Sequence, residues 1–186
     1  RETTKAPLIV GGPAFSIMPE AILDYLGADC GVVGEGERVL VGLLEDWAAG
    51  RPLPRLASEP GAGLSGAEMA APLLVPDLVR FYRERSGMAN LQTKRGCPFH
   101  CAYCTYPGLE GQVFRCRPPE AVVDDIERLQ REHGIDHLFF TDSIFNDPAG
   151  HYLRVAEEIL RRGVQLRWSA FFRPQGLGSP ELALLK

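Results

Sequence analysis

Three cysteines, Cys97, Cys101 and Cys104, lie within eight residues of the chain. Their spacing is CxxxCxxC, and an aromatic residue, Tyr103, stands directly before the last of them. Thiolates are soft ligands that suit zinc and iron–sulfur clusters. A structural zinc site normally closes with four protein ligands, whereas a cubane cluster tolerates three and leaves one iron open. The spacing therefore favours an iron–sulfur cluster whose open iron can bind a further ligand.

A zinc site is the alternative, with Cys116 or His100 as the fourth ligand. Cys116 follows Cys104 by twelve residues, which is feasible, whereas His100 sits inside the cysteine loop and is poorly placed to close a tetrahedron. The run Lys94-Arg95-Gly96 precedes the loop. Its positive charges favour thiolate formation, and its glycine favours a tight turn.

The chain has five cysteines in total, an odd number with three of them crowded together. This pattern fits a metal site in a reducing compartment better than a disulfide framework, so a cytoplasmic location is expected. Cys30 is expected to be a small hydrophobic residue in a buried strand. Cys116 lies between Arg115 and Arg117, which could lower the pKa of its thiol, although a passive role is favoured.

Composition excludes several classes of protein. The 186 residues carry a net charge of −4, so the chain lacks the excess of basic residues that is typical of nucleic-acid-binding proteins. No apolar run approaches the roughly 18 residues that span a bilayer, so no membrane association is expected. The start, Arg1 to Lys5, has neither a methionine nor the apolar core of a signal peptide and is interpreted as a cut end.

Residues 1–50 alternate between short apolar runs and helical patterns. Strands are predicted at 8–10 and 30–33, and helices at 19–26 and 37–49, each element ending at glycine. This rhythm is typical of a parallel α/β sheet. Two strands make an incomplete sheet, so the beginning of the domain is expected to be missing.

Residues 51–89 are predicted to be a linker. Frequent proline and glycine between 51 and 76 should break any regular element, and a short helix is expected within 76–87.

Residues 90–186 begin a second α/β series. Strands are predicted at 90–93, 137–141 and 164–170, with helices at 120–133 and 148–162 between them. A further helix should begin near Ser179, with Ser179 as its N-cap. Three β–α units do not close a barrel, so the favoured interpretation is the first half of a larger barrel that is truncated here.

The run from Thr93 to Cys104, TKRGCPFHCAYC, resembles the signature of the radical S-adenosylmethionine (radical SAM) superfamily. The β/α series that follows is similar to that of the superfamily's barrel. The resemblance implies that the three cysteines bind a 4Fe–4S cluster and that SAM chelates the open iron. It further implies that the reduced cluster cleaves SAM to a 5′-deoxyadenosyl radical.

The same resemblance suggests residues that contact SAM. Tyr103 would pack against the adenine, while Asp142 and Arg173 would bind the amino and carboxylate groups of the methionine moiety. The superfamily often has Gly-Gly-Glu after the second strand, whereas this chain has Asp142-Ser143-Ile144. Asn146 could line the pocket, but a role as cap of the helix at Pro148 or in a turn is favoured.

Glycine runs in the first part resemble the end of a cobalamin-binding domain. The runs are Leu8 to Pro13 (LIVGGP) and Gly34 to Glu37 (GEGE), and the residues implied in cobalamin binding are Gly11, Gly12, Gly34, Glu35 and Gly36. Glycines after a strand let the backbone approach a ligand closely. The expected fold is therefore α/β: the C-terminal part of a Rossmann-like cobalamin-binding domain, followed by the first half of a partial (β/α) radical SAM barrel.

The resemblance implies a cobalamin-dependent enzyme that transfers a methyl group to an unactivated position of a small molecule or natural product. The implied cofactors are a 4Fe–4S cluster, SAM and cobalamin, and the implied electron donor is a flavodoxin or a ferredoxin. One alternative is a radical SAM enzyme that rearranges or methylthiolates its substrate without methyl transfer. The other is a zinc-binding module without catalysis.

Overall fold

The computed structural model describes residues 5–59 and 63–186, and these residues divide into two compact units. The first unit comprises residues up to 64 together with 98–112, and the second comprises 65–97 together with 113–186. The cysteine motif therefore spans both units, since Cys97 belongs to the second unit and Cys101 and Cys104 to the first. This division differs from the linear order of domains predicted from sequence.

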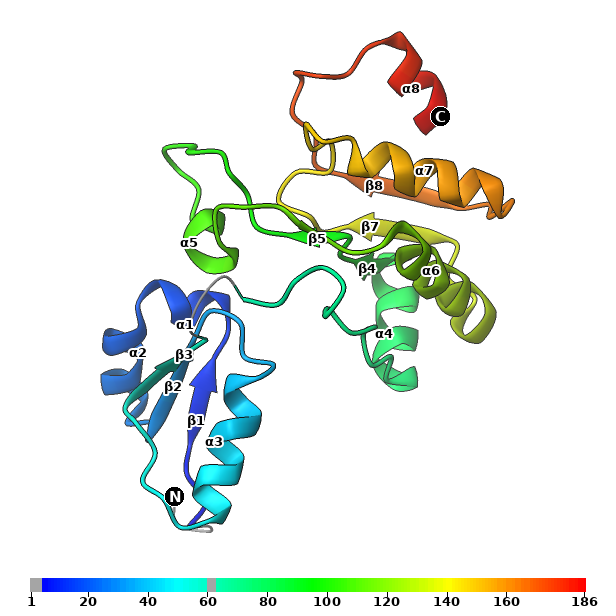
Figure 1. Cartoon of the computed structure of the whole chain (residues 1–186). Helices are drawn as coiled ribbons and strands as arrows, with labels where there is room; N and C mark the ends of the chain where they lie inside the picture. Colours follow the sequence, from blue (N-terminus) through cyan, green and yellow to red (C-terminus); the bar gives the residue numbers. More distant parts are fainter. Residues whose placement is uncertain (1–4, 60–62) are drawn as a thin grey trace. The chain divides into compact units, whose positions relative to one another are not determined.

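The first unit contains a parallel three-stranded sheet in the order β1-β2-β3 (Figure 1). Its strands are β1 (Ile9–Gly11), β2 (Cys30–Val33) and β3 (Leu56–Ser58), with Ile9 opposite Cys30 and Gly31 opposite Leu56. The strand β3 was not predicted; residues 51–76 were expected to hold no regular element, and that expectation was wrong. Backbone pairing with β2 outweighs the local effect of the surrounding prolines, which lie outside the paired residues.

Four helices accompany this sheet. They are α1 (Pro13–Ile17), α2 (Pro19–Leu26), α3 (Val39–Ala48) and α5 (Tyr106–Glu110). The helix α2 has the predicted bounds, because Pro19 occupies its first turn and Gly27 ends it in the left-handed conformation, with φ 58°. Sequence patterns did not predict the two five-residue helices α1 and α5.

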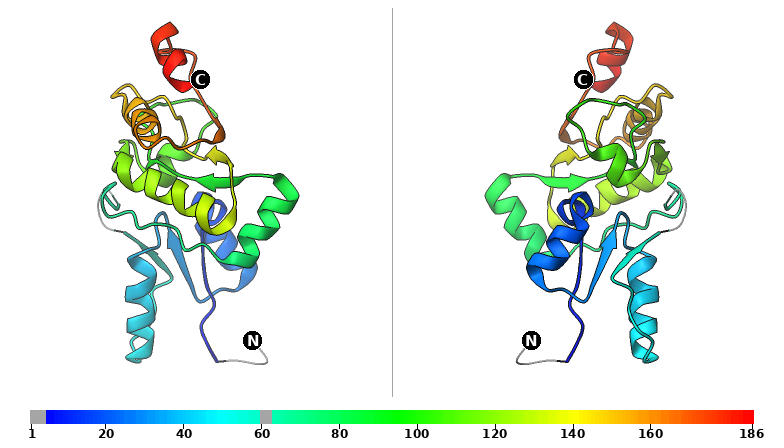
Figure 2. Two further views of the ribbon diagram at one scale, coloured as in Figure 1. Left: turned by 90° about the vertical axis from the view of Figure 1, so that its right-hand side faces the viewer. Right: turned by 90° about the vertical axis from the view of Figure 1, so that its left-hand side faces the viewer.

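The second unit is built on the parallel sheet β4-β7-β8, formed by Ala89–Leu91, His137–Phe140 and Arg167–Ala170. The helices α6 (Pro119–His133) and α7 (His151–Arg161) pack side by side (Figure 1, Figure 2). Buried apolar residues join these helices to the sheet: Val122, Ile126, Leu129, Leu138, Phe140 and Val155. The unit also contains α4 (Pro76–Ser86) and α8 (Ser179–Leu185).

The second unit also contains a short antiparallel pair of strands, separate from the parallel sheet. The strands β5 (Lys94–Arg95) and β6 (Arg115–Cys116) pair Lys94 with Cys116 and Arg95 with Arg115. They flank the cysteine loop in sequence, and the backbone N–H of Arg117 extends the pairing to the carbonyl of Thr93 at 3.0 Å. Sequence patterns did not predict this pair.

Two predicted helix starts were wrong in detail. The helix α7 begins at His151 rather than at 148, and Asp147, not Asn146, accepts hydrogen bonds from its first amides. The helix α8 has Gly178 at the N-cap, and Ser179 is its first helical residue.

The parallel strands and covering helices confirm the α/β class. None of the helices found in residues 5–59 and 63–186 is long and apolar enough to cross a membrane.

Candidate functional site

The three motif cysteines differ in accessibility. Cys97 is buried in the second unit, while Cys101 is exposed and Cys104 is half-buried in the first. The amide of Cys104 donates to the carbonyl of Cys101 at 3.0 Å, so these two residues share one turn. All three thiols are free.

The donor set fits an iron–sulfur cluster by its chemistry. Three unbridged thiols within one short loop are soft ligands, and an exposed or half-buried thiol can be reached by incoming iron. Among the described residues, no three His, Cys, Asp or Glu side chains gather closely enough to hold a metal ion. The fit thus rests on the chemistry of the three thiols and not on a preformed cluster of ligands, and the ligand assignment of Cys97, Cys101 and Cys104 stays a prediction.

Tyr103 projects from the cysteine turn into solvent. Its side chain is 90% exposed, which is high for a large aromatic residue. An aromatic ring this open is available to stack on a planar ligand. The predicted contact with the adenine of SAM has an accessible surface, and it too stays a prediction.

Asp142 follows β7 and lies in the interior. Its carboxylate accepts hydrogen bonds from the amide of Thr93 at 2.7 Å, from the hydroxyl of Thr93, and from the ammonium of Lys94 at 2.9 Å. The side chain has no exposed surface. Both oxygens of Asp142 already have partners inside the protein, and the direct contact of Asp142 with SAM stays a prediction.

Arg173 lies in the loop after β8, and its backbone is fixed by Asn146. The amide of Arg173 donates to Asn146 Oδ1 at 2.9 Å, and Asn146 Nδ2 donates back to the carbonyl of Arg173 at 2.9 Å. A third bond joins Asn146 Nδ2 to the carbonyl of Gln175 at 3.1 Å. Asn146 thus holds the loop that carries the predicted carboxylate-binding arginine.

The two glycine turns of the first unit are joined by one hydroxyl. Ser16 Oγ donates to the carbonyl of Gly12 and accepts from the amide of Gly34, both at 2.9 Å. Gly12 and Gly34 have φ of 98° and 79°, which residues with a Cβ rarely adopt. The turns that were predicted from separate sequence runs are therefore neighbours at the carboxyl ends of β1 and β2.

A pocket of about 460 Å³ opens beside these turns. Its lining comes from the first unit alone: Gly12, Pro13, Ala14, Ser16, Ile17, Gly34, Thr105, Tyr106, Leu109 and Glu110. The residues 105–110 belong to α5 and the residue before it, directly after Cys104. The pocket thus places the glycine turns next to the segment that leaves the cysteine motif.

The remaining predicted cobalamin residues lie in the turn after β2. The carboxylate of Glu35 accepts a hydrogen bond from the amide of Leu64 at 3.0 Å. Gly11 ends β1, where an added Cβ would lie 3.3 Å from the carbonyl oxygen of Val32. A Cβ added at Gly36 would lie 3.6 Å from a methyl group of Val32. Their contacts with cobalamin stay predictions.

The two isolated cysteines are structural in character. Cys30 is fully buried in β2, as predicted, and burial raises the pKa of its thiol. Burial also raises the pKa of Cys116, with a smaller contribution from Asp147. The suggestion that Arg115 and Arg117 would lower the pKa of Cys116 was wrong: desolvation raises this pKa, and the charges that oppose the rise are those of Lys94 and Arg154.

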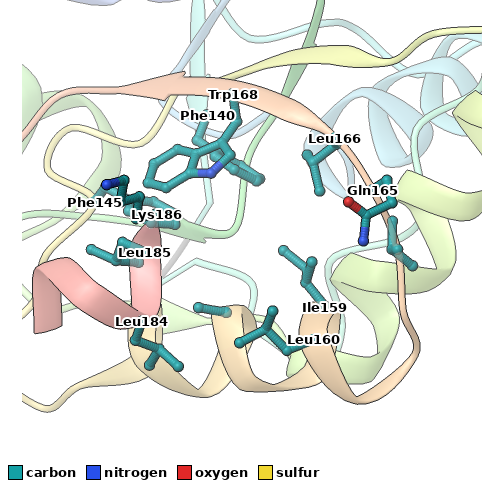
Figure 3. Close-up of a pocket in the computed structure, with 12 residues that line it drawn as sticks. Phe140, Phe145, Ile159, Leu160, Gln165, Leu166, Trp168, Leu184, Leu185 and Lys186 are labelled. Atoms are coloured by element: carbon teal, nitrogen blue, oxygen red, sulfur yellow. The ribbon is translucent and has the colours of Figure 1, made fainter. Parts of the chain in front are cut away.

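A second pocket, of about 130 Å³, lies in the second unit between the sheet and two helices. Figure 3 shows Trp168 of β8 at the top, Ile159 and Leu160 of α7 at the lower right, and Leu185 of α8 at the left. Phe145 also lines it and lies 5.3 Å, between ring centroids, from Trp168. Its lining is largely apolar and carries none of the predicted site residues.

Comparison with known proteins bears directly on these sites. No family model matches the chain. The tryptophan 2-C-methyltransferase of Streptomyces laurentii is 29% identical over 225 residues, covering 87% of this chain and 37% of that protein. The hopanoid C-3 methylase of Methylococcus capsulatus is 27% identical over 172 residues, covering 86% of this chain and 33% of that protein.

The fold comparison covers the whole chain. TsrM from Kitasatospora setae, a radical SAM methyltransferase solved with cobalamin and a 4Fe–4S cluster bound, is 28% identical and superposes with a TM-score of 0.79. The chain is a relative of the cobalamin-dependent radical SAM methyltransferases. A second TsrM structure, with tryptophan and a SAM analogue bound, gives a TM-score of 0.80 and matches 100% of this chain but 40% of that one. The chain thus spans about 40% of the length of this relative.

The structural roles of several residues were not predicted from the sequence. Ser16, Thr93, Lys94 and Asp147 organise the turns and strand ends described above, yet each is a common residue in an ordinary context. One signal was available for Lys94: a lysine at the carboxyl end of a buried strand requires an acidic partner. The acidic residues after the next strand, Asp142 and Asp147, were the candidates.

Proposed function

We propose that the protein is a cobalamin-dependent radical SAM methyltransferase that acts on a small molecule. The observation that carries this proposal is the fold match over the entire chain to TsrM, combined with three free cysteines in the CxxxCxxC motif. The chain spans about 40% of the length of TsrM, and the activity proposed is that of the whole protein.

The residues of the cysteine motif would hold the cluster, and Tyr103 and Arg173 would contact SAM. When bound, a 4Fe–4S cluster supplies the electron that breaks a carbon–sulfur bond of SAM, and cobalamin supplies a carrier for its methyl group. Arg173 can bind a carboxylate through its guanidinium, since Asn146 fixes the backbone from which it extends. Tyr103 offers an exposed ring for stacking.

The pocket beside Gly12 and Gly34 is the proposed place for part of the cobalamin. Its volume of about 460 Å³ suits a portion of a large ligand, and its glycines allow close approach of the backbone. Ser16 would keep the two turns in register. The residues Gly11, Glu35 and Gly36 would complete this surface.

The remaining parts of the proposal concern the electron donor, the location and the substrate. The electron donor would be a flavodoxin or a ferredoxin, and the reaction would take place in the cytoplasm, where cysteines stay reduced. The tryptophan 2-C-methyltransferase acts on an amino acid, as its name states. A small organic substrate is therefore the class we propose.

The test uses the full-length protein, reconstituted anaerobically with iron and sulfide and supplied with SAM bearing a deuterated methyl group. The proposal predicts S-adenosylhomocysteine formation that depends on both cobalamin and the cluster. Release of 5′-deoxyadenosine, with no cobalamin-dependent loss of the methyl group, would instead indicate a radical enzyme that does not methylate. Stoichiometric zinc and no reaction with SAM would indicate a binding module.

A matched pair of variants controls this test. Cys101→Ala removes a proposed cluster ligand and should abolish the reaction. Cys30→Ala removes a buried thiol of similar size that lies in β2 and outside the motif. The second variant should retain cluster and activity, because Cys30 serves only as a core residue.

A further inference from the structure

A buried lysine sits directly before the cysteine motif. Lys94 is 1% exposed, and its ammonium lies 2.9 Å from Asp142 Oδ2 and 3.9 Å from Asp147 Oδ2. It also donates to the carbonyl of Phe145 at 2.8 Å, and it lies 5.2 Å from the centroid of the Phe145 ring. A buried ammonium is costly unless it is paired and hydrogen-bonded, so this arrangement must be maintained by the fold.

The partner carboxylate binds the backbone as well as the ammonium. Asp142 Oδ1 accepts from the amide of Thr93 at 2.7 Å and from the amide of Lys94 at 3.3 Å. Its other oxygen accepts from the Thr93 hydroxyl and the Lys94 ammonium. One side chain therefore fixes two consecutive residues of the segment that leads into the motif.

The next residues of this segment are held in the same way. Ser143 Oγ donates to the carbonyl of Gly96 at 3.2 Å, and Gly96 immediately precedes Cys97. On its other side the segment pairs with β6, where Lys94 lies opposite Cys116. Residues 93–96 are thus held between Asp142-Ser143 and β6, and Cys97, itself 4% exposed, follows directly.

We propose that Asp142 and Lys94 are positioning residues for Cys97. Their buried pair fixes the backbone of residues 93–96 and thereby the position of the Cys97 thiol, the first proposed cluster ligand. This inference rests on the proposed function, because it assigns the motif cysteines to a cluster. It differs from the expectation that Asp142 binds the amino group of SAM directly. Replacing a residue that hydrogen-bonds to a metal ligand or fixes its position commonly weakens metal binding.

The experiment compares four variants of the full-length protein: Asp142→Asn, Lys94→Met, the double variant, and Ser143→Ala. Asp142→Asn leaves the Lys94 ammonium with only the more distant carboxylate of Asp147, at 3.9 Å, and Lys94→Met leaves the buried carboxylates without the ammonium. The double variant removes both members of the closer pair. Ser143→Ala removes one hydrogen bond to the Gly96 carbonyl and buries no charge. The control is Asp136→Asn, which breaks an exposed pair with Arg167 near the opposite ends of β7 and β8.

Three readouts separate positioning from general stability. They are iron and sulfide retained per chain under a chelator, the electron paramagnetic resonance spectrum of the reduced cluster without SAM, and hydrogen exchange of amides 93–97 in the apo-protein. We expect each single charge variant to hold iron about tenfold more weakly. Its spectrum should broaden and its amides 93–97 should exchange faster, while the rest of the sheet stays protected.

The double variant should recover part of the iron retention, and Ser143→Ala should fall between wild type and Asp142→Asn. The control should match wild type in all three readouts. A wild-type cluster and spectrum in Asp142→Asn, with weakened SAM binding, would overturn the inference and favour direct SAM contact. Unchanged readouts in all variants would overturn it too, while leaving the proposed function intact.

Failure of the proposed function has a different signature. In that case the wild-type protein itself takes up no iron–sulfur cluster, and the positioning inference falls with it. If a charge variant does not fold, Ser143→Ala still decides, because it leaves the buried pair in place. Normal exchange of amides 93–97 and a wild-type spectrum in folded Ser143→Ala would then count against the inference.

Discussion

Lys94 Nζ and Asp142 Oδ2 lie 2.9 Å apart in the interior of the second unit, with side chains 1% and 0% exposed. The pair connects the end of β7 to the segment that enters the cysteine motif. Such a pair contributes little net stability when it is intact, because desolvation offsets the attraction. Removing Asp142 alone is costly, since the buried Lys94 ammonium then keeps only the carbonyl of Phe145 and the carboxylate of Asp147 at 3.9 Å.

This asymmetry predicts that Asp142→Asn lowers the free energy of unfolding by about 3–5 kcal/mol. The exposed pair of Arg167 and Asp136, with side chains 70% exposed, should contribute within about 1 kcal/mol. Denaturant unfolding of the apo-protein at pH 7 measures both. Equal, small losses in Asp142→Asn and Asp136→Asn would contradict the buried character of the first pair.

Glu158 of α7 binds Arg161 and Arg162, and Arg162 also binds Asp124 and Glu127 of α6. Hydrogen bonds from Arg161 and Arg162 lower the pKa of its carboxyl from 4.5 to about 2. Because the pKa is lower in the folded state, the carboxylate stabilises the fold fully above pH 4.5, and this contribution disappears as the pH falls towards 2. Glu158→Gln should therefore be less stable than wild type at pH 7, and the difference should shrink across this window.

Thermal unfolding at a series of pH values checks the prediction for Glu158. Glu132→Gln is the matched control, because Glu132 pairs with Arg131 at the surface and is 49% exposed. The control should show a small difference from wild type that varies little with pH. A Glu158→Gln difference that stays constant down to pH 2 would argue against the assigned pKa shift.

His151 lies at the start of α7 and is 1% exposed. Its Nε2 is 2.8 Å from the carbonyl of Arg117, which requires a proton on Nε2, while Nδ1 is buried and has no hydrogen-bond partner within residues 5–59 and 63–186. Burial lowers the pKa of the imidazole from 6.5. The folded state therefore favours the neutral ring, and stability is lost as the pH falls below 6.5 and the unfolded chain gains a proton.

The variant His151→Gln should remove this part of the pH dependence. Wild type should lose stability between about pH 7 and pH 5, and the variant should have a flatter profile in that range. The window lies above that of Glu158, so the two effects can be separated in one titration. A wild-type profile that is flat from pH 7 to pH 5 would be inconsistent with a neutral buried His151.

Gly66 is required by close packing against β6. A Cβ at this position would lie 1.6 Å from the carbonyl oxygen of Cys116, which is backbone and cannot move aside easily. Gly66→Ala should therefore destabilise the protein by about 1–3 kcal/mol, towards the upper end of that range. Gly42→Ala, in α3 with open space around the added methyl, should be neutral or stabilising by up to about 1 kcal/mol.

Local patterns predicted the elements whose signals lie within their own residues. The helix α2 is bounded by Pro19 and Gly27, and α6 by Pro119 and Gly134, so both could be located from sequence. The strand β3 has no such signal; it forms because Gly31 and Val33 of β2 offer pairing positions that are distant along the chain.

The candidate site was predictable to a similar degree. The spacing of the cysteines and the glycines after β1 and β2 can be read directly. The role of Asp142 cannot, because its partners, Thr93 and Lys94, are separated from it by about 50 residues and meet it only in the folded sheet. Ser16, which bonds both glycine turns, was hidden for the same reason.

The central claim is that Cys97, Cys101 and Cys104 hold a 4Fe–4S cluster whose open iron binds SAM. The most direct measurement is electron paramagnetic resonance of the anaerobically reconstituted, dithionite-reduced full-length protein, with and without SAM. The account predicts the signal of a reduced 4Fe–4S cluster that changes when SAM is added and is absent in Cys101→Ala. Stoichiometric zinc with no such signal, or a cluster signal that SAM leaves unchanged, would contradict it.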